Sequence, residues 1–523
     1  MPPLTRALPL LLAAPLAAQS SSTWELVGPP AISDGSAICC QIAVARDGTP
    51  YVAFQDQSTA AIRCSVLQHR NGAWSYVGGK GSASNGQAWY NKLAIDATDR
   101  VYLACRDYAS NGRISVRTFD AAAGAWSNVG PGGSSPGEAH YTDIAIAPDG
   151  APTVIYADRT TAPADEASAV VYRDGIWQWL GTQGFSQAGA GYPSLDVDAQ
   201  GAVYAAFADA NQPDAATLTG KASVMRFDSN TATWSYLGNP GFSPHGAQNI
   251  TVTLDRLGNP WIAYYRWHAQ IVVMRFDGAA WQQVGYSGAG TDLPEVQTEA
   301  WRQWLSLAFD SQNTPYVAYQ SYLEGNRASV RRFDGLDWVP VGNTAFSPGA
   351  ADYLAMTVGP NDVPYVVFRD AANLQRVTVM RFAPSPQNYC TAVVNSLGCT
   401  PSIAASGMPS LSGTDPILIR ATNVITHRTG LLLFGDGGDR APFHGGFLCV
   451  RAPFRRGGTA DSGGGDGIVD CSGMLERDLG PYLRTAPSAF QPGMHVFAQF
   501  YYRDLQSAAG VGLTDGVRIE LLP

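Results

Sequence analysis

The chain has 523 residues, of which 45% are hydrophobic and only 15% are charged, and its formal net charge is −9. This length exceeds one ordinary compact domain, and the 56 glycines, 34 prolines and 13 tryptophans predict many short strands joined by turns. An acidic chain without a basic run lacks the electrostatic footprint of a nucleic-acid-binding protein and is poorly suited to anionic membranes.

Residues 1–18 have the pattern of a secretory signal peptide. Arg6 supplies the positive charge, residues 7–16 are apolar, and Ala17-Ala18-Gln19 offers small residues for cleavage. A membrane anchor is the alternative, but the apolar run is too short to span a bilayer. We therefore expect a secreted or cell-surface protein with no transmembrane segment in the mature chain. Export makes the eight cysteines potential disulfide partners rather than metal ligands.

Residues 19–383 form a tandem repeat. Its most regular pattern is Trp-x-x-(Val or Leu)-Gly, which occurs seven times, at Trp24, Trp74, Trp126, Trp177, Trp234, Trp281 and Trp338. Between successive copies lie an apolar strand, a strand such as Tyr316–Tyr319 and a strand such as Val273–Asp277. Each unit thus holds four short strands, which is the pattern of a propeller blade. The repeat predicts an all-β fold, a seven-bladed β-propeller, rather than a sandwich or a helical solenoid.

The two ends of the repeat array are complementary. The last unit stops at Phe382 without its Trp-x-x-Val-Gly strand, and an orphan copy stands at Trp24–Gly28. We predict that this N-terminal strand pairs beside Gln375–Phe382 and closes the ring, which leaves no open sheet edge. The repeating tryptophans are then expected to pack between or within blades.

One position at the start of each innermost strand is expected to ring the mouth of the central channel. Five of its seven occupants are aromatic; the seven are Cys39, Tyr90, Tyr141, Tyr192, Asn249, Trp304 and Tyr353. The second strand of each blade leaves on the same face. It ends in a polar residue and an aspartate in most blades, as at Arg106-Asp107 and Arg369-Asp370. Because these aspartates repeat with the fold, we expect them to be structural, either capping a turn or bridging to the neighbouring blade.

Departures from the repeat concentrate on this face. Blade five carries Tyr265-Arg266-Trp267-His268, and blade six is entered through a long loop with Glu295, Glu299, Trp301 and Arg302. Aromatic rings beside planar polar groups suit carbohydrate recognition, and large aromatic concavities also suit protein ligands. The alternative is that the tyrosines only plug the channel. The predicted ligand-binding set is Trp89, Tyr90, Arg106, His140, Tyr141, Tyr192, Gln248, Arg266, Trp267, His268, Trp301, Arg302, Trp304, Tyr353 and Arg369.

No catalytic residue is assigned. His140, Tyr265, Arg266 and His268 are the candidates if the protein is a polysaccharide lyase, which needs a base and a group that neutralises the substrate carboxylate. A glycosidase would need two carboxylates, for which the loop of blade six offers a pair. The seven histidines are scattered, and glycine-rich aspartates such as Asp461 lack the spacing of a calcium loop, so neither a metal nor a cofactor is predicted.

Beyond a linker at residues 384–389 the blade pattern ends, and residues 390–523 predict a small β-sandwich with disulfides. Three pairings of its four cysteines are possible, and we favour Cys390–Cys399 with Cys449–Cys471. Four further cysteines fall in the first two blades, where one or two disulfides of unassigned pairing would brace the ring closure. These four are Cys39, Cys40, Cys64 and Cys105.

The repeats resemble those of exported bacterial tandem-repeat propeller proteins, most closely at Leu307–Tyr319, Val273–Gly278 and Ala328–Gly335. The tail looks like a C-terminal module that recurs in secreted proteins of environmental bacteria, on segments such as Tyr389–Ala392 and Gly446–Val450. The resemblance of the repeats implies a propeller fold, and that of the tail implies an accessory role at the cell surface or in secretion. It carries no catalytic residues.

These patterns predict a secreted, monomeric, non-catalytic recognition protein that binds a glycan or a surface protein through the channel-mouth face. The sequence gives no indication of a nucleic-acid partner. One alternative is a carbohydrate-active enzyme, a polysaccharide lyase or glycosidase, that uses the same face. A second alternative is a structural component of the cell envelope.

Overall fold

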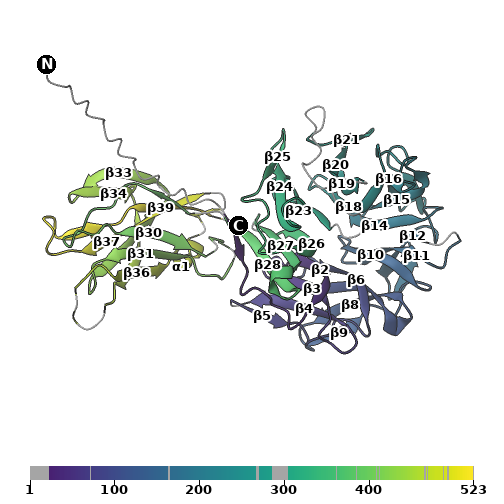
Figure 1. Cartoon of the computed structure of the whole chain (residues 1–523), viewed down its shortest axis with the longest axis horizontal. Helices are drawn as coiled ribbons and strands as arrows, with labels where there is room; N and C mark the ends of the chain where they lie inside the picture. Colours follow the sequence, from purple (N-terminus) through teal and green to yellow (C-terminus); the bar gives the residue numbers. More distant parts are fainter. Residues whose placement is uncertain are drawn as a thin grey trace, which may run out of the picture.

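The structure is a computed structural model. It describes residues 23–521 apart from 71, 163–164, 267–269, 286–303, 361, 384–385, 408, 412, 465–466, 468, 487 and 492–493. The predicted signal peptide therefore lies outside the described residues. Within them the chain forms ten sheets, of which seven have four antiparallel strands each and surround a common axis as propeller blades (Figure 1).

The seven blades follow one another along the chain, and each runs from an innermost to an outermost strand. Blade one is β2–β5 (Ala37–Val44, Pro50–Asp56, Cys64–Arg70, Ala73–Tyr76), and blade two is β6–β9 (Ala88–Ile95, Val101–Asp107, Arg113–Asp120, Ala125–Asn128). Blade three is β10–β13 (Ala139–Ile146, Pro152–Asp158, Glu166–Arg173, Ile176–Trp179), and blade four is β14–β17 (Ala190–Val197, Val203–Pro213, Gly220–Asp228, Thr233–Tyr236). Blades five and six are β18–β21 (Ala247–Leu254, Pro260–Arg266, Gln270–Phe276, Trp281–Gln283) and β22–β25 (Leu305–Phe309, Pro315–Ser321, Arg327–Phe333, Trp338–Pro340). Short 3-10 turns follow the second strand in blades two and seven, at Tyr108–Ser110 and Ala371–Asn373.

The N-terminal strand closes the ring, as the sequence predicts. Blade seven contains β26 (Ala351–Val358), β27 (Pro364–Asp370) and β28 (Arg376–Ala383), and β1 (Thr23–Leu26) is its outermost strand. β1 pairs antiparallel with β28, and Trp24 stands opposite Phe382. The innermost strands touch their neighbours all the way round, including β26 against β2. The fold is thus held together end to end by backbone hydrogen bonds between residues far apart in sequence.

The repeating tryptophans clamp each blade to the one before it. The indole N–H of every one of the seven donates to the carbonyl of the Val or Leu in the preceding copy of the motif, at 2.6 to 3.1 Å. The glycine after that Val or Leu lies against the same indole: a Cβ at Gly78 would stand 2.9 Å from Trp126, and Gly78 has φ +73°. The whole motif therefore serves packing between blades, as predicted.

The aspartates at the end of the second strands cap turns, as predicted. Each is completely buried and accepts a hydrogen bond from the backbone N–H two residues later, at 2.9 to 3.0 Å. The five are Asp56, Asp107, Asp158, Asp209 and Asp370. In these five blades the aspartate thus belongs to the turn that follows the second strand.

The C-terminal region is a β-sandwich. Its larger sheet has the order β29-β39-β37-β32-β35 with β38 paired to β37, the smaller has the order β30-β31-β36, and β33 and β34 form a hairpin. The apolar core lies between the two sheets, and a short helix, α1, packs against it through Leu483. The elements are β29 (Gln387–Tyr389), β30 (Ser402–Ser406), β31 (Leu418–Val424), β32 (Thr429–Gly435), β33 (Gly438–Phe443), β34 (Gly446–Val450), β35 (Arg455–Asp461), β36 (Gly473–Asp478), α1 (Gly480–Arg484), β37 (His495–Arg503), β38 (Val511–Leu513) and β39 (Gly516–Glu520).

The disulfide pairing differs from the one that the sequence favoured. All four C-terminal cysteines are bonded, but as Cys390–Cys449 and Cys399–Cys471. The reason is the sheet order: β29 pairs with β39 rather than with its chain neighbour, which brings Cys390 to the end of β34 instead of leaving it beside Cys399. β29 also begins at Gln387, inside the segment expected to be a linker.

The four cysteines of the first two blades are free thiols, so the expected disulfides at the ring closure do not form. Cys40, Cys64 and Cys105 are at most 1% exposed and lie in apolar clusters between blades, where each acts as a small hydrophobic side chain. Among the residues that the structure describes, no helix is both long enough and apolar enough to span a membrane.

Candidate functional site

A β-bulge recurs at the start of the innermost strands. In six blades the strand register shifts there, for example between His140 and Asp143. The residue within the bulge is left-handed in each of the six, with φ from 47° to 54°: Cys39, Tyr90, Tyr141, Tyr192, Asn249 and Tyr353. Left-handed backbone is unfavourable for bulky side chains, and each such residue costs roughly 1–3 kcal/mol. A bulge changes the direction of a side chain, and here it does so at the channel mouth.

Three of these tyrosines form a row across blades two, three and four. The ring centroids of Tyr90 and Tyr141 are 5.0 Å apart, and those of Tyr141 and Tyr192 are 4.8 Å apart. The three side chains are partly exposed rather than buried. Burial raises the pKa of Tyr90 and of Tyr192 to about 12, and it also raises the pKa of Tyr141 above its ordinary value. The row is therefore a surface of neutral phenols. We call it the tyrosine row.

A second aromatic pair stands on blades six and seven. Trp304 and Tyr353 have ring centroids 4.3 Å apart, and the guanidinium of Arg369 lies 4.9 Å from the Tyr353 centroid. Arg369 also pairs with Asp352, which accepts a further hydrogen bond from Gln320 at 3.0 Å. Arginine stacked on an aromatic ring and held by a carboxylate is a rigid planar group with defined donors.

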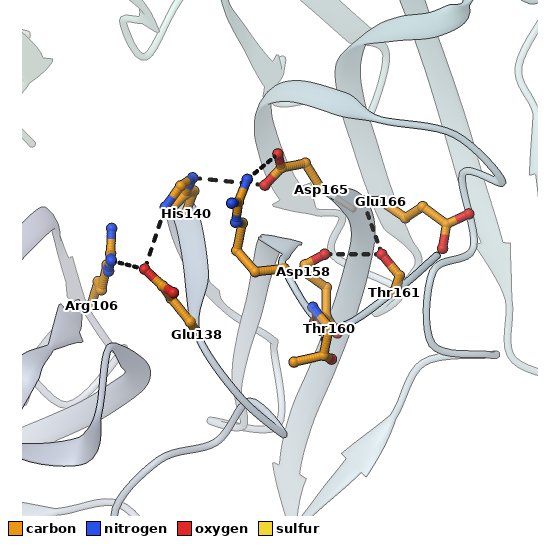
Figure 2. A network of polar contacts seen from close by, with 9 residues as sticks. Arg106, Glu138, His140, Asp158, Thr160, Thr161, Asp165 and Glu166 are labelled. Carbon is orange, nitrogen blue, oxygen red and sulfur yellow. Dashed lines mark hydrogen bonds and ion pairs between the residues drawn. The ribbon is translucent and has the colours of Figure 1, made fainter. Parts of the chain in front are cut away.

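Beside the tyrosine row lies a network of charged side chains, shown in Figure 2. Arg106 pairs with Glu138, whose Oε1 is 3.8 Å from His140 Nε2. On its other side, His140 Nδ1 is 3.7 Å from Asp165 Oδ1. Arg159 Nη1 donates to Asp165 Oδ2 at 2.8 Å. Two arginines and two carboxylates thus surround one histidine, and their charges cancel.

His140 connects this network to the tyrosine row. Its ring centroid is 6.0 Å from that of Tyr90 and 6.1 Å from that of Tyr141. The pKa of His140 is lowered from its ordinary value, first because burial disfavours the charged ring and next because Arg106 repels it. Glu138 and Asp165 act in the opposite direction without reversing the shift. The neutral imidazole offers one donor and one acceptor.

Several buried polar atoms beneath the row have no hydrogen-bond partner among the described residues. Asn91 follows Tyr90 and is 1% exposed, and neither end of its amide is paired. Thr142 follows Tyr141 and is 2% exposed, and its hydroxyl is unpaired. The Nε of Arg106 is unpaired as well. A buried polar atom without a partner is costly, so this layer fits a place where water or a ligand completes the hydrogen bonds.

The structure brings most of the predicted ligand-binding residues to one face. Strand register sets Trp89 opposite Arg106 and Gln248 opposite Tyr265, and it places Arg266 at the end of β19. Trp89, Tyr90, Arg106, His140, Tyr141 and Tyr192 form one group, and Trp304, Tyr353 and Arg369 form another. Trp267, His268, Trp301 and Arg302 lie outside the described residues.

Two further results concern individual candidates. Tyr265 is 1% exposed, its hydroxyl donates to the backbone of Trp304 at 3.1 Å, and burial raises its pKa, so it packs between blades rather than facing a ligand. Sequence reasoning missed Glu138, Arg159 and Asp165, because each occurs in only one blade and in a loop or strand start that the repeat does not mark. Their proximity to His140 arises only when neighbouring blades pack.

No family model matches the chain, and a search of curated proteins also gives no match. Several solved structures are similar. A fungal alcohol oxidase in complex with copper is 12% identical with a TM-score of 0.45, and the match covers 96% of this chain and 100% of that one. An ulvan lyase, from a new family of polysaccharide lyases, is 13% identical with a TM-score of 0.44, covering 69% and 95%. A fucose-specific lectin from Aleuria aurantia is 14% identical with a TM-score of 0.39, covering 60% and 96%. At these identities and scores the likenesses assign no function to this chain.

Proposed function

We propose that this is a secreted, non-catalytic recognition protein that binds a glycan through its channel-mouth face. The observation that carries the proposal is the tyrosine row: three partly exposed rings in successive blades, each held on a bulge with unfavourable backbone. Blades one and five fill the same bulge position with Cys39 and Asn249, so the fold itself does not require tyrosine there. The two disulfides of the C-terminal sandwich fit an oxidising, extracellular environment.

The chemistry of the face favours a sugar ligand. The faces of pyranose rings carry C–H groups that pack on aromatic rings, while their hydroxyls need donors and acceptors at the ring edge. The tyrosine row supplies the packing surface, and His140 with its neighbouring charged groups supplies the hydrogen bonds. A row of three rings suits several consecutive sugar units better than it suits one small molecule.

The same observations argue against a lyase that uses a tyrosine as base. Burial raises the pKa of Tyr90 and Tyr192 to about 12, so both phenols keep their protons near neutral pH. Tyr265 is enclosed between blades. His140 would be the remaining described base candidate, and Glu138 and Asp165 on its two sides would repel the substrate carboxylate that such an enzyme has to bind.

The test compares Tyr141→Asn with the wild type on a panel of purified neutral and acidic polysaccharides. Asparagine tolerates left-handed backbone and occupies the same position in blade five as Asn249, so the fold should be kept. We expect the substitution to weaken glycan binding by about tenfold or more, because it removes the middle ring of the row. Binding is measured by titration calorimetry, and unsaturated products are followed by ultraviolet absorbance in the same samples.

Trp179→Ala is the matched control, because Trp179 is an aromatic side chain of the same blade that is 42% exposed on the outermost strand. It should bind as the wild type does. Equal binding by Tyr141→Asn and the wild type would show that the glycan does not bind at the channel-mouth face. Rising absorbance that is lost in Tyr141→Asn would make the protein a lyase.

A further inference from the structure

We infer that the glycan recognised by this face is electrically neutral, an inference that rests on the proposed function. On the described part of the face three arginines near the aromatic rings have carboxylate partners: Arg106 with Glu138, Arg159 with Asp165, and Arg369 with Asp352. A fourth arginine of this face, Arg266, donates to the amide oxygen of Gln270 at 3.0 Å. Three positive and three negative charges cancel. A polyanionic chain that packs on the tyrosine row would therefore meet no excess positive charge from these three pairs.

The exposure of the Arg106–Glu138 pair supports this inference. The Glu138 side chain is 48% exposed, whereas the Arg106 side chain beneath it is only 10% exposed. A ligand that approaches His140 thus meets the carboxylate before the guanidinium. A uronate or sulfate group that approaches from this side would have to come close to this carboxylate, and like charges at short range are strongly unfavourable in a partly desolvated site.

Uncharged hydroxyls match the same groups well. A hydroxyl both donates and accepts, so it can donate to the Glu138 carboxylate and accept from Arg106 at the same time. Hydrogen bonds to charged groups are stronger than those between neutral groups, which gives a neutral sugar affinity without a net charge.

The first experiment measures the ligand class directly on the wild-type protein. Titrations use the neutral polymers galactomannan, xyloglucan and laminarin, the uronates polygalacturonate and alginate, and the sulfated polymer carrageenan, each at low and at raised salt. We expect binding to at least one neutral polymer, with an affinity that is nearly independent of salt because no net charge is screened. Tyr141→Asn should lose that binding.

The outcomes separate the two proposals. Preference for an acidic polymer, weakened by salt and lost in Tyr141→Asn, would overturn the neutral class and leave glycan recognition standing. Binding of no polymer, or equal binding by Tyr141→Asn, would overturn the proposed function and this inference together. Neutral binding that survives raised salt supports both.

A charge variant tests the stated cause. Glu138→Gln/Asp165→Asn leaves Arg106 and Arg159 without carboxylate partners, so we expect polygalacturonate binding to rise about tenfold or more at low salt and to fall as salt is raised. Asp149→Asn is the control, because it also frees an arginine of blade three, Arg173, but at the turn between β10 and β11. It should gain nothing. A folded double variant with no gain would show that these carboxylates do not set the ligand class and would overturn the inference.

Discussion

The tryptophan clamps and the tyrosine row are built from the same repeat, but the repeat determines the side chain at the clamps and only the backbone conformation at the row. At the clamps the repeat fixes the side chains: seven indoles make the same hydrogen bond to the preceding copy of the motif. At the channel mouth the repeat fixes the backbone: six bulges have nearly the same φ, but their side chains range from Cys39 through Asn249 to tyrosine.

This difference separates what the fold requires from what it permits. A clamp residue cannot vary, because its hydrogen bond and its contact with the neighbouring glycine join two blades. A bulge residue can vary, because its side chain leaves the sheet. Tyrosines on three adjacent blades are therefore not a consequence of the ring geometry, which Cys39 and Asn249 satisfy equally well. The proposed site depends on this position, because its side chain can change without loss of the fold.

The largest expected effect comes from breaking a clamp. Trp126 is 7% exposed and donates to the carbonyl of Val77 at 2.8 Å, so Trp126→Ala removes a large buried side chain together with that hydrogen bond. We expect the free energy of unfolding to fall by about 3–5 kcal/mol, as for other large-to-small core substitutions. Urea denaturation measures it. Glycan binding by the fraction that remains folded should be unchanged.

The exposed Trp179 again provides the comparison for this variant, since Trp179→Ala should change the free energy of unfolding by less than about 0.5 kcal/mol. Loss of binding in fully folded Trp126→Ala would contradict the separation between clamp and face. A small stability loss, similar to that of Trp179→Ala, would mean that the clamp contributes little.

A smaller effect is expected at the glycine of the motif. Gly78→Ala adds a Cβ 2.9 Å from the Trp126 indole at a residue with φ +73°, so it combines backbone strain with a clash. Gly124→Ala, at φ +64° with no atom within 4 Å of its Cβ, has the strain alone. We expect about 1 kcal/mol of destabilisation for Gly124→Ala and about 1–3 kcal/mol more for Gly78→Ala, measured by urea denaturation. Equal losses would show that the indole moves aside at no cost.

The fold was largely predictable because its signals are periodic. A motif that recurs seven times marks the blades, and the orphan copy at Trp24 indicates the closure by β1 that the structure confirms. The disulfides were not predictable in the same way. Cys390 and Cys399 are close in sequence but bond elsewhere, since the order of strands in the sandwich decides which cysteines meet.

The candidate site was predictable in part for the same reason. Tyr90, Tyr141 and Tyr192 share a repeat position, so alignment of the blades with one another finds them. Glu138, Arg159 and Asp165 have no repeat partner. They reach His140 from the residue before β10, the residue after β11 and the residue before β12 respectively, and only the packed structure shows that their charges cancel. The inference of a neutral ligand therefore depends on geometry that periodicity does not contain.

The smallest expected effect is a pH dependence at the junction of the row and the charged network. Because the pKa of His140 is lowered in the folded protein, the unfolded chain takes up this proton more readily than the folded one does. Stability should therefore be complete above the unfolded pKa of about 6.5 and fall as pH decreases from there towards the lowered folded value. The groups that face the ring are Glu138, Asp165, Arg106 and Arg159, with the tyrosine row beside them.

His140→Gln should flatten this part of the melting-temperature profile, whereas His444→Gln in the sandwich should leave it unchanged. A profile that keeps its slope in His140→Gln would assign the pH dependence to other groups, and one that rises towards acid pH in the wild type would reverse the sign argued for His140.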